Sequence, residues 1–414
     1  QGIKEVTMHE VGHTLGLRHN FKASTLYSLA DLNDVTKTKE TGLGSSVMDY
    51  NPVNLVPEGT TQGDYYSTTI GPYDHWAIEY GYKPFGKRKP EDEVEDLAKI
   101  ASRSGEPALA FGTDEDARSI DPDPHCWRFD FGQDLVKYAN QQAKVVAEAW
   151  PGIVDQMTDE GEGYERTRRA FGVLLATHGR SMYMASRYVG GSHVSRSHKG
   201  DDNAPEPFEV VTPEQQRYAL GLLEEKEFND NPFDFPPELY NHLAASRWDH
   251  WGTDLPDRAD YPAHRVILMW QDLILRRLLS SLTLTRLHDT ELKVPEDQDA
   301  LTTAELLERL TATVFAEVSS IGDDEYTNRK PAISSLRRNL QRAFLRHMSV
   351  LALGKTSSPE DCATVAYLQL TRLKSQTDQM LAGAENLDSY SRAHLQETSA
   401  RITKVIDANM MIAP

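Results

Sequence analysis

The stretch MHEVGHTLGLRHN, residues 8–20, contains one glutamate and three histidines: His9, Glu10, His13 and His19. We predict a helix over residues 3–15, in which His9 and His13 lie four residues apart and therefore on one face. Gly16 is expected to end this helix, because glycine adopts left-handed backbone angles at little cost. The chain then reverses, so that His19 can approach the same point from another side.

Three neutral imidazole nitrogens with one open coordination position are typical of a catalytic zinc site. A single histidine on a helix is more often a packed or surface residue. Here the spacing H-E-x-x-H-x-x-G-x-x-H is met at every position, which is a specific signature of zinc-dependent peptide hydrolysis. The sequence therefore predicts zinc ligands at His9, His13 and His19, with Glu10 as the general base.

The composition excludes several other classes of protein. The 414 residues suffice for two or three domains, and 39% hydrophobic with 26% charged residues is ordinary for a globular chain. A formal net charge of −19 argues against a nucleic-acid partner. The longest apolar stretch, residues 266–284, is interrupted by Asp272 and two arginines, so no membrane span is predicted. Cys126 and Cys362 could pair or remain buried thiols, and nothing in the sequence fixes the oligomeric state.

With these residues in place, the sequence resembles the metzincin clan of zinc endopeptidases. Metzincins carry a methionine in a tight turn beneath the metal, and GSSVMDY, residues 44–50, is similar to that turn. The resemblance makes Met48 a hydrophobic floor under the imidazoles. It also makes Tyr50 either a hydrogen-bond donor to the developing oxyanion or a ligand of the resting zinc. Asn20 differs from the residues typical of the best-known branches, so no branch is assigned.

A further segment, IGPYDHWAIEYGY at residues 70–82, resembles the helix that closes the lower metzincin subdomain. Asp74, Ala77 and Ile78 match that pattern, and their expected role is packing beneath the metal floor.

Residues 111–117, 190–201 and 261–268 resemble segments of the large bacterial metzincin-type proteases with a long helical C-terminal extension. That resemblance implies a peptide or protein substrate and an extracellular, periplasmic or cell-surface location. Any targeting segment lies outside this chain.

The chain starts at Gln1, only a few residues before the metal motif. In metzincins the subdomain that clamps the substrate lies N-terminal to the active-site helix. By this resemblance we expect the chain to be weakly active or inactive by itself, although its parent protein is an enzyme. The alternative function is a partner-binding helical protein or scaffold whose zinc site is catalytically inactive.

The predicted fold is mainly α-helical, with the C-terminal subdomain of a metzincin catalytic domain followed by a multi-helix domain. Residues 1–85 carry the motif, the methionine turn and the lower subdomain; residues 86–130 form an acidic connector; residues 131–414 form the helical extension. The connector carries four aspartates that either belong to a solvated loop or hold a calcium ion: Asp114, Asp116, Asp121 and Asp123.

The extension contains a long loop near residues 189–213 that we expect to be functional or to approach the catalytic cleft. Its His193 and His198 could suggest a second metal but are more typical of surface residues. Beyond the loop, Thr302 with Glu305 predicts a capping box, Pro331 is predicted to open a helix, and Asp388 to cap the last one.

Overall fold

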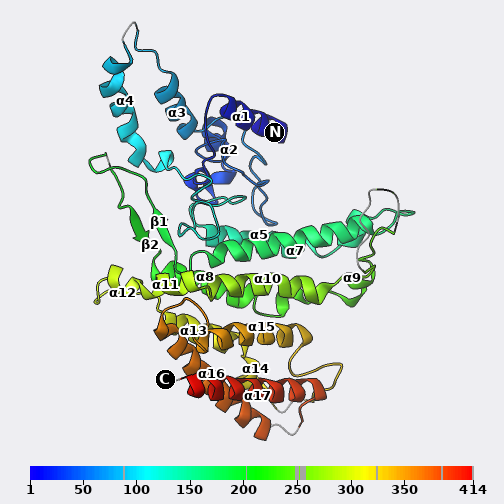
Figure 1. Ribbon diagram of the computed structural model, residues 1–414. Helices are drawn as coiled ribbons and strands as arrows, with labels where there is room; N and C mark the ends of the chain where they lie inside the picture. Colours follow the sequence, from blue (N-terminus) through cyan, green and yellow to red (C-terminus); the bar gives the residue numbers. More distant parts are fainter. Residues whose placement is uncertain are drawn as a thin grey trace. The chain divides into compact units, whose positions relative to one another are not determined.

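The computed structural model describes residues 1–86, 89–201, 203–247, 251, 258–322, 325–383 and 386–412. Within that part of the chain the structure is mainly helical, as predicted (Figure 1). Its helices and strands, in chain order, are α1 (Gly2–Thr14), α2 (Val35–Thr41), α3 (Pro72–Tyr82), α4 (Val94–Ala101), α5 (Leu135–Ala149), α6 (Ile153–Met157), α7 (Glu165–Ser186), β1 (Ser192–Val194), β2 (Phe208–Val210), α8 (Pro213–Lys226), α9 (Pro237–Asn241), α10 (Ala263–Leu278), α11 (Ser281–His288), α12 (Thr290–Lys293), α13 (Thr303–Val314), α14 (Glu317–Ser320), α15 (Ser335–Ala352), α16 (Glu360–Gly383) and α17 (Ser389–Ile412).

The chain divides into two compact units. Unit 1 comprises residues 1–148 and 191–211, and unit 2 comprises residues 149–190 and 212–414. The predicted boundaries at residues 85 and 130 both fall inside unit 1. Residues 87 and 88 of the predicted connector and residue 202 of the long loop lie outside the described residues.

The long loop that follows α7 contains a short antiparallel sheet, which the sequence analysis did not predict. Strands β1 and β2 pair Ser192 with Val210 and Val194 with Phe208. Each strand has only three residues, too few for an alternating pattern to stand out. The backbone N–H of Ser192 donates to the carbonyl of Pro122 at 3.1 Å, which joins this hairpin to the rest of unit 1.

Unit 2 is a helical assembly in which long helices pack on one another in succession. Helix α7 packs on α10, α10 on α15, α15 on α16, and α16 on α17 (Figure 1). Helix α15 has a buried apolar face: Leu340, Phe344 and Met348 have no exposed surface. Burial of such faces supplies the main favourable free energy of this unit.

Helix caps in unit 2 agree with the sequence at two positions and differ at one. The hydroxyl of Thr302 accepts the N–H of Glu305, and the carboxylate of Asp388 accepts the N–H of Ser391, so both residues cap helices as predicted. The predicted capping box is only half formed, because the carboxylate of Glu305 pairs with Arg217 instead. The prediction that Pro331 opens a helix is wrong, because α15 begins four residues later, after the N-cap Ser334. The intervening N–H of Ala332 donates to Asp388 instead, which holds that segment outside the helix.

Both cysteines are buried. None of the described helices combines the length and the hydrophobicity that a membrane span requires.

Candidate metal centre

Helix α1 is unusual in that its buried face is polar. It buries Glu5, His9 and Gly12, whereas Ile3 and Val6 are 88% and 59% exposed. An ordinary surface helix has the opposite arrangement. The packing of α1 against the rest of unit 1 therefore serves to hold particular polar side chains in place.

The turn after α1 orients the second histidine. Gly16 has a left-handed φ of +87°, and the helix ends before it, as the sequence predicts. The N–H of Leu17 donates to the carbonyl of Gly12 at 3.1 Å and the N–H of Gly16 to that of His13 at 3.0 Å. These two bonds make a Schellman motif. The carbonyl of Leu17 consequently lies 2.9 Å from Nδ1 of His13 and accepts its proton.

The methionine turn orients the first histidine. The carbonyl of Val47 lies 2.7 Å from Nδ1 of His9. Met48 is fully buried next to α1, where a Cβ at Gly12 would come within 2.3 Å of the Met48 sulfur. Position 12 must therefore be glycine if the methionine is to pass beneath the helix.

Helix α3 fixes the methionine turn. The buried carboxylate of Asp74 accepts the N–H of Val47 and that of Gly71, each at 2.9 Å, and the hydroxyl of Ser46 at 2.5 Å. The N–H of Tyr73 donates to the carbonyl of Ser45 at 2.8 Å. Asp74 thus supports the same residue whose carbonyl holds His9. The segment supports the methionine turn mainly through these hydrogen bonds, whereas Ala77 and Ile78, for which the sequence also predicts packing beneath the metal floor, are only partly buried.

The third histidine is oriented by a carboxylate that lies 95 residues away in the chain. Oδ2 of Asp114 is 2.9 Å from Nδ1 of His19. The neighbouring Asn20 is fully buried, donates to the carbonyl of Ala110 at 3.0 Å and accepts the N–H of Gly112 at 3.2 Å. Asn20 therefore joins the segment that carries His19 to the segment that carries Asp114.

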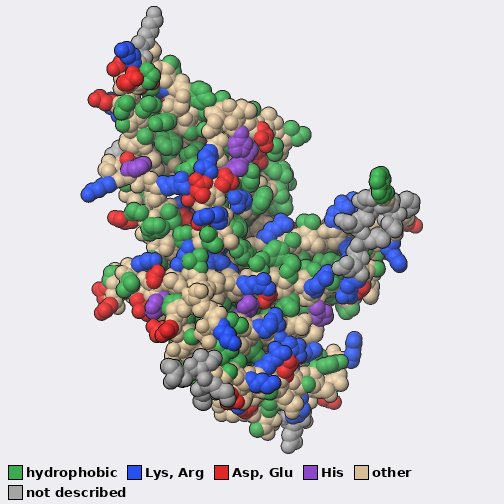
Figure 2. Space-filling view, viewed as in Figure 1, with side chains coloured by type: hydrophobic (Ala, Val, Ile, Leu, Met, Phe, Trp, Pro, Cys, Tyr) green, Lys and Arg blue, Asp and Glu red, His purple; other side chains and the backbone are tan. Residues whose placement is uncertain are grey.

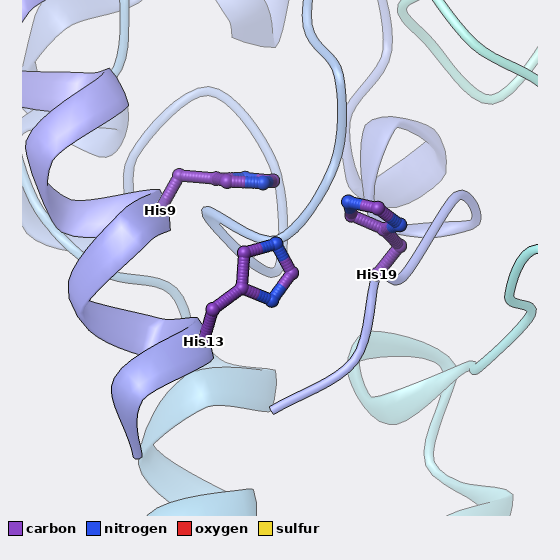
Figure 3. A group of neighbouring side chains, drawn as sticks. All are labelled: His9, His13 and His19. Carbon is purple, nitrogen blue, oxygen red and sulfur yellow. The ribbon is translucent and has the colours of Figure 1, made fainter. Parts of the chain in front are cut away.

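The three imidazoles face one point (Figure 3). One nitrogen from each of His9, His13 and His19 lies within 4.8 Å of the others. Each Nδ1 faces an oxygen that accepts a hydrogen bond, so each Nδ1 donates, and in the neutral ring the lone pair is then on Nε2. Nε2 of His19 is buried without a hydrogen-bond partner. This set of donors fits a zinc ion.

The comparison with protein families agrees with this geometry. A model of the Met-zincin family matches residues 1–321, more than three quarters of the chain. The chain belongs to the Met-zincin family. Comparisons with curated proteins and with solved structures find no match. The Met-zincin match includes all of unit 1 and ends within unit 2.

The two predicted catalytic residues of this Met-zincin chain lie beside the imidazoles. The ring of Tyr50 is 4.6 Å from that of His19 and 5.4 Å from that of His9, measured between centroids, and Tyr50 is 37% exposed. Glu10 is exposed on α1. Histidine side chains reach the surface of unit 1 near α1, among acidic and basic side chains (Figure 2). The site is therefore open to solvent on one side.

The surroundings of the buried His9 favour the neutral form of its imidazole. Burial lowers the pKa of His9, and the neighbouring His13 and His19 lower it further, whereas the hydrogen bond to Val47 and the charge of Glu10 raise it. A neutral imidazole is the form that binds zinc.

The four aspartates considered for calcium do not converge on one point. Asp114 faces His19, Asp116 pairs with Arg196 at 2.6 Å, Asp121 pairs with Arg118 at 3.0 Å, and Asp123 pairs with a lysine. Each carboxylate thus faces a basic side chain instead of sharing a cation with the others.

Sequence reasoning missed the roles of Gly12, Asn20 and Asp114. Gly12 lies between the two histidines of α1, but the motif leaves its position unspecified. In the sequence, Asn20 stands out only because it differs from the residues typical of the best-known metzincin branches. Asp114 was interpreted only as one of four aspartates of a solvated loop or a calcium site, because the sequence alone does not indicate that it meets His19.

Proposed function

We propose that this chain carries the catalytic centre of a zinc-dependent endopeptidase, with His9, His13 and His19 as the metal ligands. The observation that carries the proposal is the state of the three Nδ1 atoms. All three are held by acceptors, which leaves three Nε2 lone pairs directed at one point. Such carboxylate or carbonyl partners fix the tautomer and ring orientation of zinc-ligating histidines.

A zinc ion bound here supplies Lewis acidity, which activates a water molecule and polarises the scissile carbonyl. Glu10 follows His9 directly on α1 and is exposed beside the cluster. Its carboxylate removes a proton from the attacking water and then delivers a proton to the departing amine. In this role the Glu10 side chain needs no structural partner, and its carboxylate makes no hydrogen bond to the described residues.

Tyr50 is assigned to the developing negative charge on the scissile carbonyl oxygen. Its ring packs against those of His19 and His9, and its partial exposure leaves the hydroxyl accessible to a substrate. A hydroxyl donor placed at such an oxygen stabilises the transition state more than the ground state. The substrate class is a peptide or protein, in line with the Met-zincin family.

The experiment is a comparison of Glu10→Gln with the unchanged protein in peptide hydrolysis and in zinc content. Loss of a general base typically lowers the rate by about 10²–10⁴-fold. We expect that loss with one zinc still bound at the three histidines, since Glu10 is not a ligand. A matched control is Glu40→Gln, an exposed glutamate on α2.

Equal hydrolysis by the Glu10→Gln variant and the unchanged protein would contradict the assignment of Glu10. Because the chain by itself is expected to be weakly active or inactive, the same comparison is also made in the longer parent protein. Zinc binding without measurable hydrolysis by the parent protein would favour the alternative function, a zinc-containing scaffold or partner-binding protein.

A further inference from the structure

A second cluster of metal-ligating side chains lies in unit 1, apart from the three-histidine centre. It consists of Asp123, His125 and His193, whose ligand atoms lie within 4.8 Å of one another. The first two residues belong to the segment before α5, and His193 lies on strand β1, about seventy residues further along the chain. The imidazole rings of His125 and His193 are 4.3 Å apart.

The hairpin is fixed to the segment that carries Asp123. The N–H of Val194 donates to Oδ2 of Asp123 at 3.0 Å, and that of Ser192 donates to the carbonyl of Pro122 at 3.1 Å. These two bonds flank His193 on both sides. Its imidazole is therefore placed by backbone contacts that do not involve the ring itself.

The two oxygens of Asp123 have different surroundings. Oδ2 lies 2.5 Å from Nζ of Lys22, which also contacts the carbonyl of Val194. Oδ1 accepts the backbone N–H of His125 at 2.9 Å and lies 3.5 Å from Nδ1 of His193. Lys22 thus balances the charge at one oxygen, while the other oxygen faces the imidazoles.

Hydrogen bonding within the described residues leaves one ring nitrogen of this cluster unsatisfied. Nδ1 of His193 is buried and makes no hydrogen bond there. The contact of 3.5 Å with Oδ1 of Asp123 is too long for a good hydrogen bond, and a buried polar nitrogen without one destabilises the folded state. A structural role alone is therefore a poor account of this histidine. A metal ion shared with Asp123 and His125 would supply the missing interaction.

The cluster borders a cavity through which an ion can enter. The cavity has a volume of about 1070 Å³, and its lining includes His125, His193, Tyr73 and Trp76. It is large enough for a hydrated cation together with a small ligand. Coordination positions that the protein does not fill would face this space.

We propose that Asp123, His125 and His193 bind a divalent transition-metal ion such as zinc, at a site separate from the three-histidine centre. Two imidazole nitrogens and one carboxylate oxygen suit zinc or another first-row metal, whereas calcium and magnesium prefer oxygen ligands alone. The ion links the β1–β2 hairpin to the segment before α5. It therefore stabilises unit 1 when bound, because it binds the folded state.

The test is a titration of the metal-free protein with zinc ions alone, with bound zinc quantified after removal of the excess. The unchanged protein is expected to bind two equivalents. His193→Ala should bind one, as should His13→Ala/His19→Ala, and the triple variant should bind none. His198→Ala is the matched control, because it removes an exposed histidine from the same hairpin and should leave two.

The variants distinguish failure of this proposal from failure of the proposed function. Two equivalents in His193→Ala, or none in His13→Ala/His19→Ala, would overturn the second site. One equivalent in the unchanged protein that is lost only in His193→Ala would support the second site and contradict the three-histidine centre. Since His193→Ala could fail to fold, cobalt absorption bands of His13→Ala/His19→Ala give a second readout, and their absence would also overturn the proposal.

Discussion

The three histidines of the motif differ in what holds their second ring nitrogen. Backbone carbonyls hold His9 and His13, and a carboxylate holds His19. A carbonyl belongs to the backbone and survives a change of side chain. Asp114 is therefore the residue through which one ligand can be altered without replacing the ligand itself.

We expect Asp114→Ala to weaken zinc binding at the three-histidine centre. Loss of a partner that orients a ligand typically lowers metal affinity by about 10–100-fold. The measurement is zinc affinity by competition with a chelator, made in a His193→Ala background so that only this centre binds. Glu115→Gln is the control, because Glu115 is the next residue but pairs with Arg18 instead. Equal affinities in the Asp114→Ala and Glu115→Gln proteins would refute a positioning role for Asp114.

The boundaries of helix α1 could be predicted from the sequence, but the face that it buries could not. The spacing of its histidines predicted the helix and its end at Gly16, and the fold agrees to within one residue at each end. Hydrophobic periodicity would have predicted that Ile3 and Val6 face the interior, whereas both are exposed. The histidines of this helix are present for their ability to bind metal, and His9 is buried because its hydrogen-bond partner lies inside unit 1.

The contact between α1 and the methionine turn can be tested by a substitution at Gly12. In Gly12→Ala the new methyl group would overlap the sulfur of Met48, so the turn must shift. Overpacking of this kind costs about 1–3 kcal/mol of unfolding free energy. We expect that loss in denaturant unfolding of the metal-free protein, together with weaker zinc binding.

Gly81→Ala is the matched control, because it is also a helical glycine and no atom lies within 4 Å of its added methyl group. It should leave stability unchanged or raise it by up to about 1 kcal/mol. A Gly12→Ala protein as stable as the Gly81→Ala protein would contradict the close approach of Met48.

Across the whole molecule, features that depend on neighbouring residues were predicted better than contacts between segments far apart in the sequence. The mainly helical fold, the N-caps at Thr302 and Asp388 and the end of α1 before Gly16 follow from neighbouring residues, and they agree with the structure. The meeting of His19 with Asp114, or of His193 with Asp123, joins segments about 70–95 residues apart. No local pattern encodes such pairs, so the second cluster could not be predicted and His193 was interpreted as a surface residue.

Stability of the whole molecule should fall in acid, in part because of one buried histidine of unit 2. Burial, followed by the charges of Arg342 and Arg338, lowers the pKa of His394 from 6.5 to about 3. Between these values the unfolded chain takes up a proton that the folded chain does not. Stability contributed by His394 is therefore complete above about pH 6.5 and is lost as the pH falls toward 3, by up to about 1.4 kcal/mol per unit.

The measurement is the unfolding free energy as a function of pH, compared between the unchanged protein and His394→Gln. We expect a smaller loss in the variant across this range, with His198→Gln as the control for an exposed histidine. Parallel pH profiles for the unchanged protein and His394→Gln would show that His394 is not held neutral in the folded chain.

The central claim is that three Nε2 atoms share one zinc ion, and X-ray absorption at the zinc edge tests it most directly. The His193→Ala protein with one equivalent of zinc should show three imidazole nitrogens at about 2.0–2.1 Å, with a water oxygen completing the site. Adding His13→Ala and His19→Ala should abolish that signal. A zinc ion coordinated by oxygen alone, or an imidazole signal that persists in the combined variant, would contradict the claim.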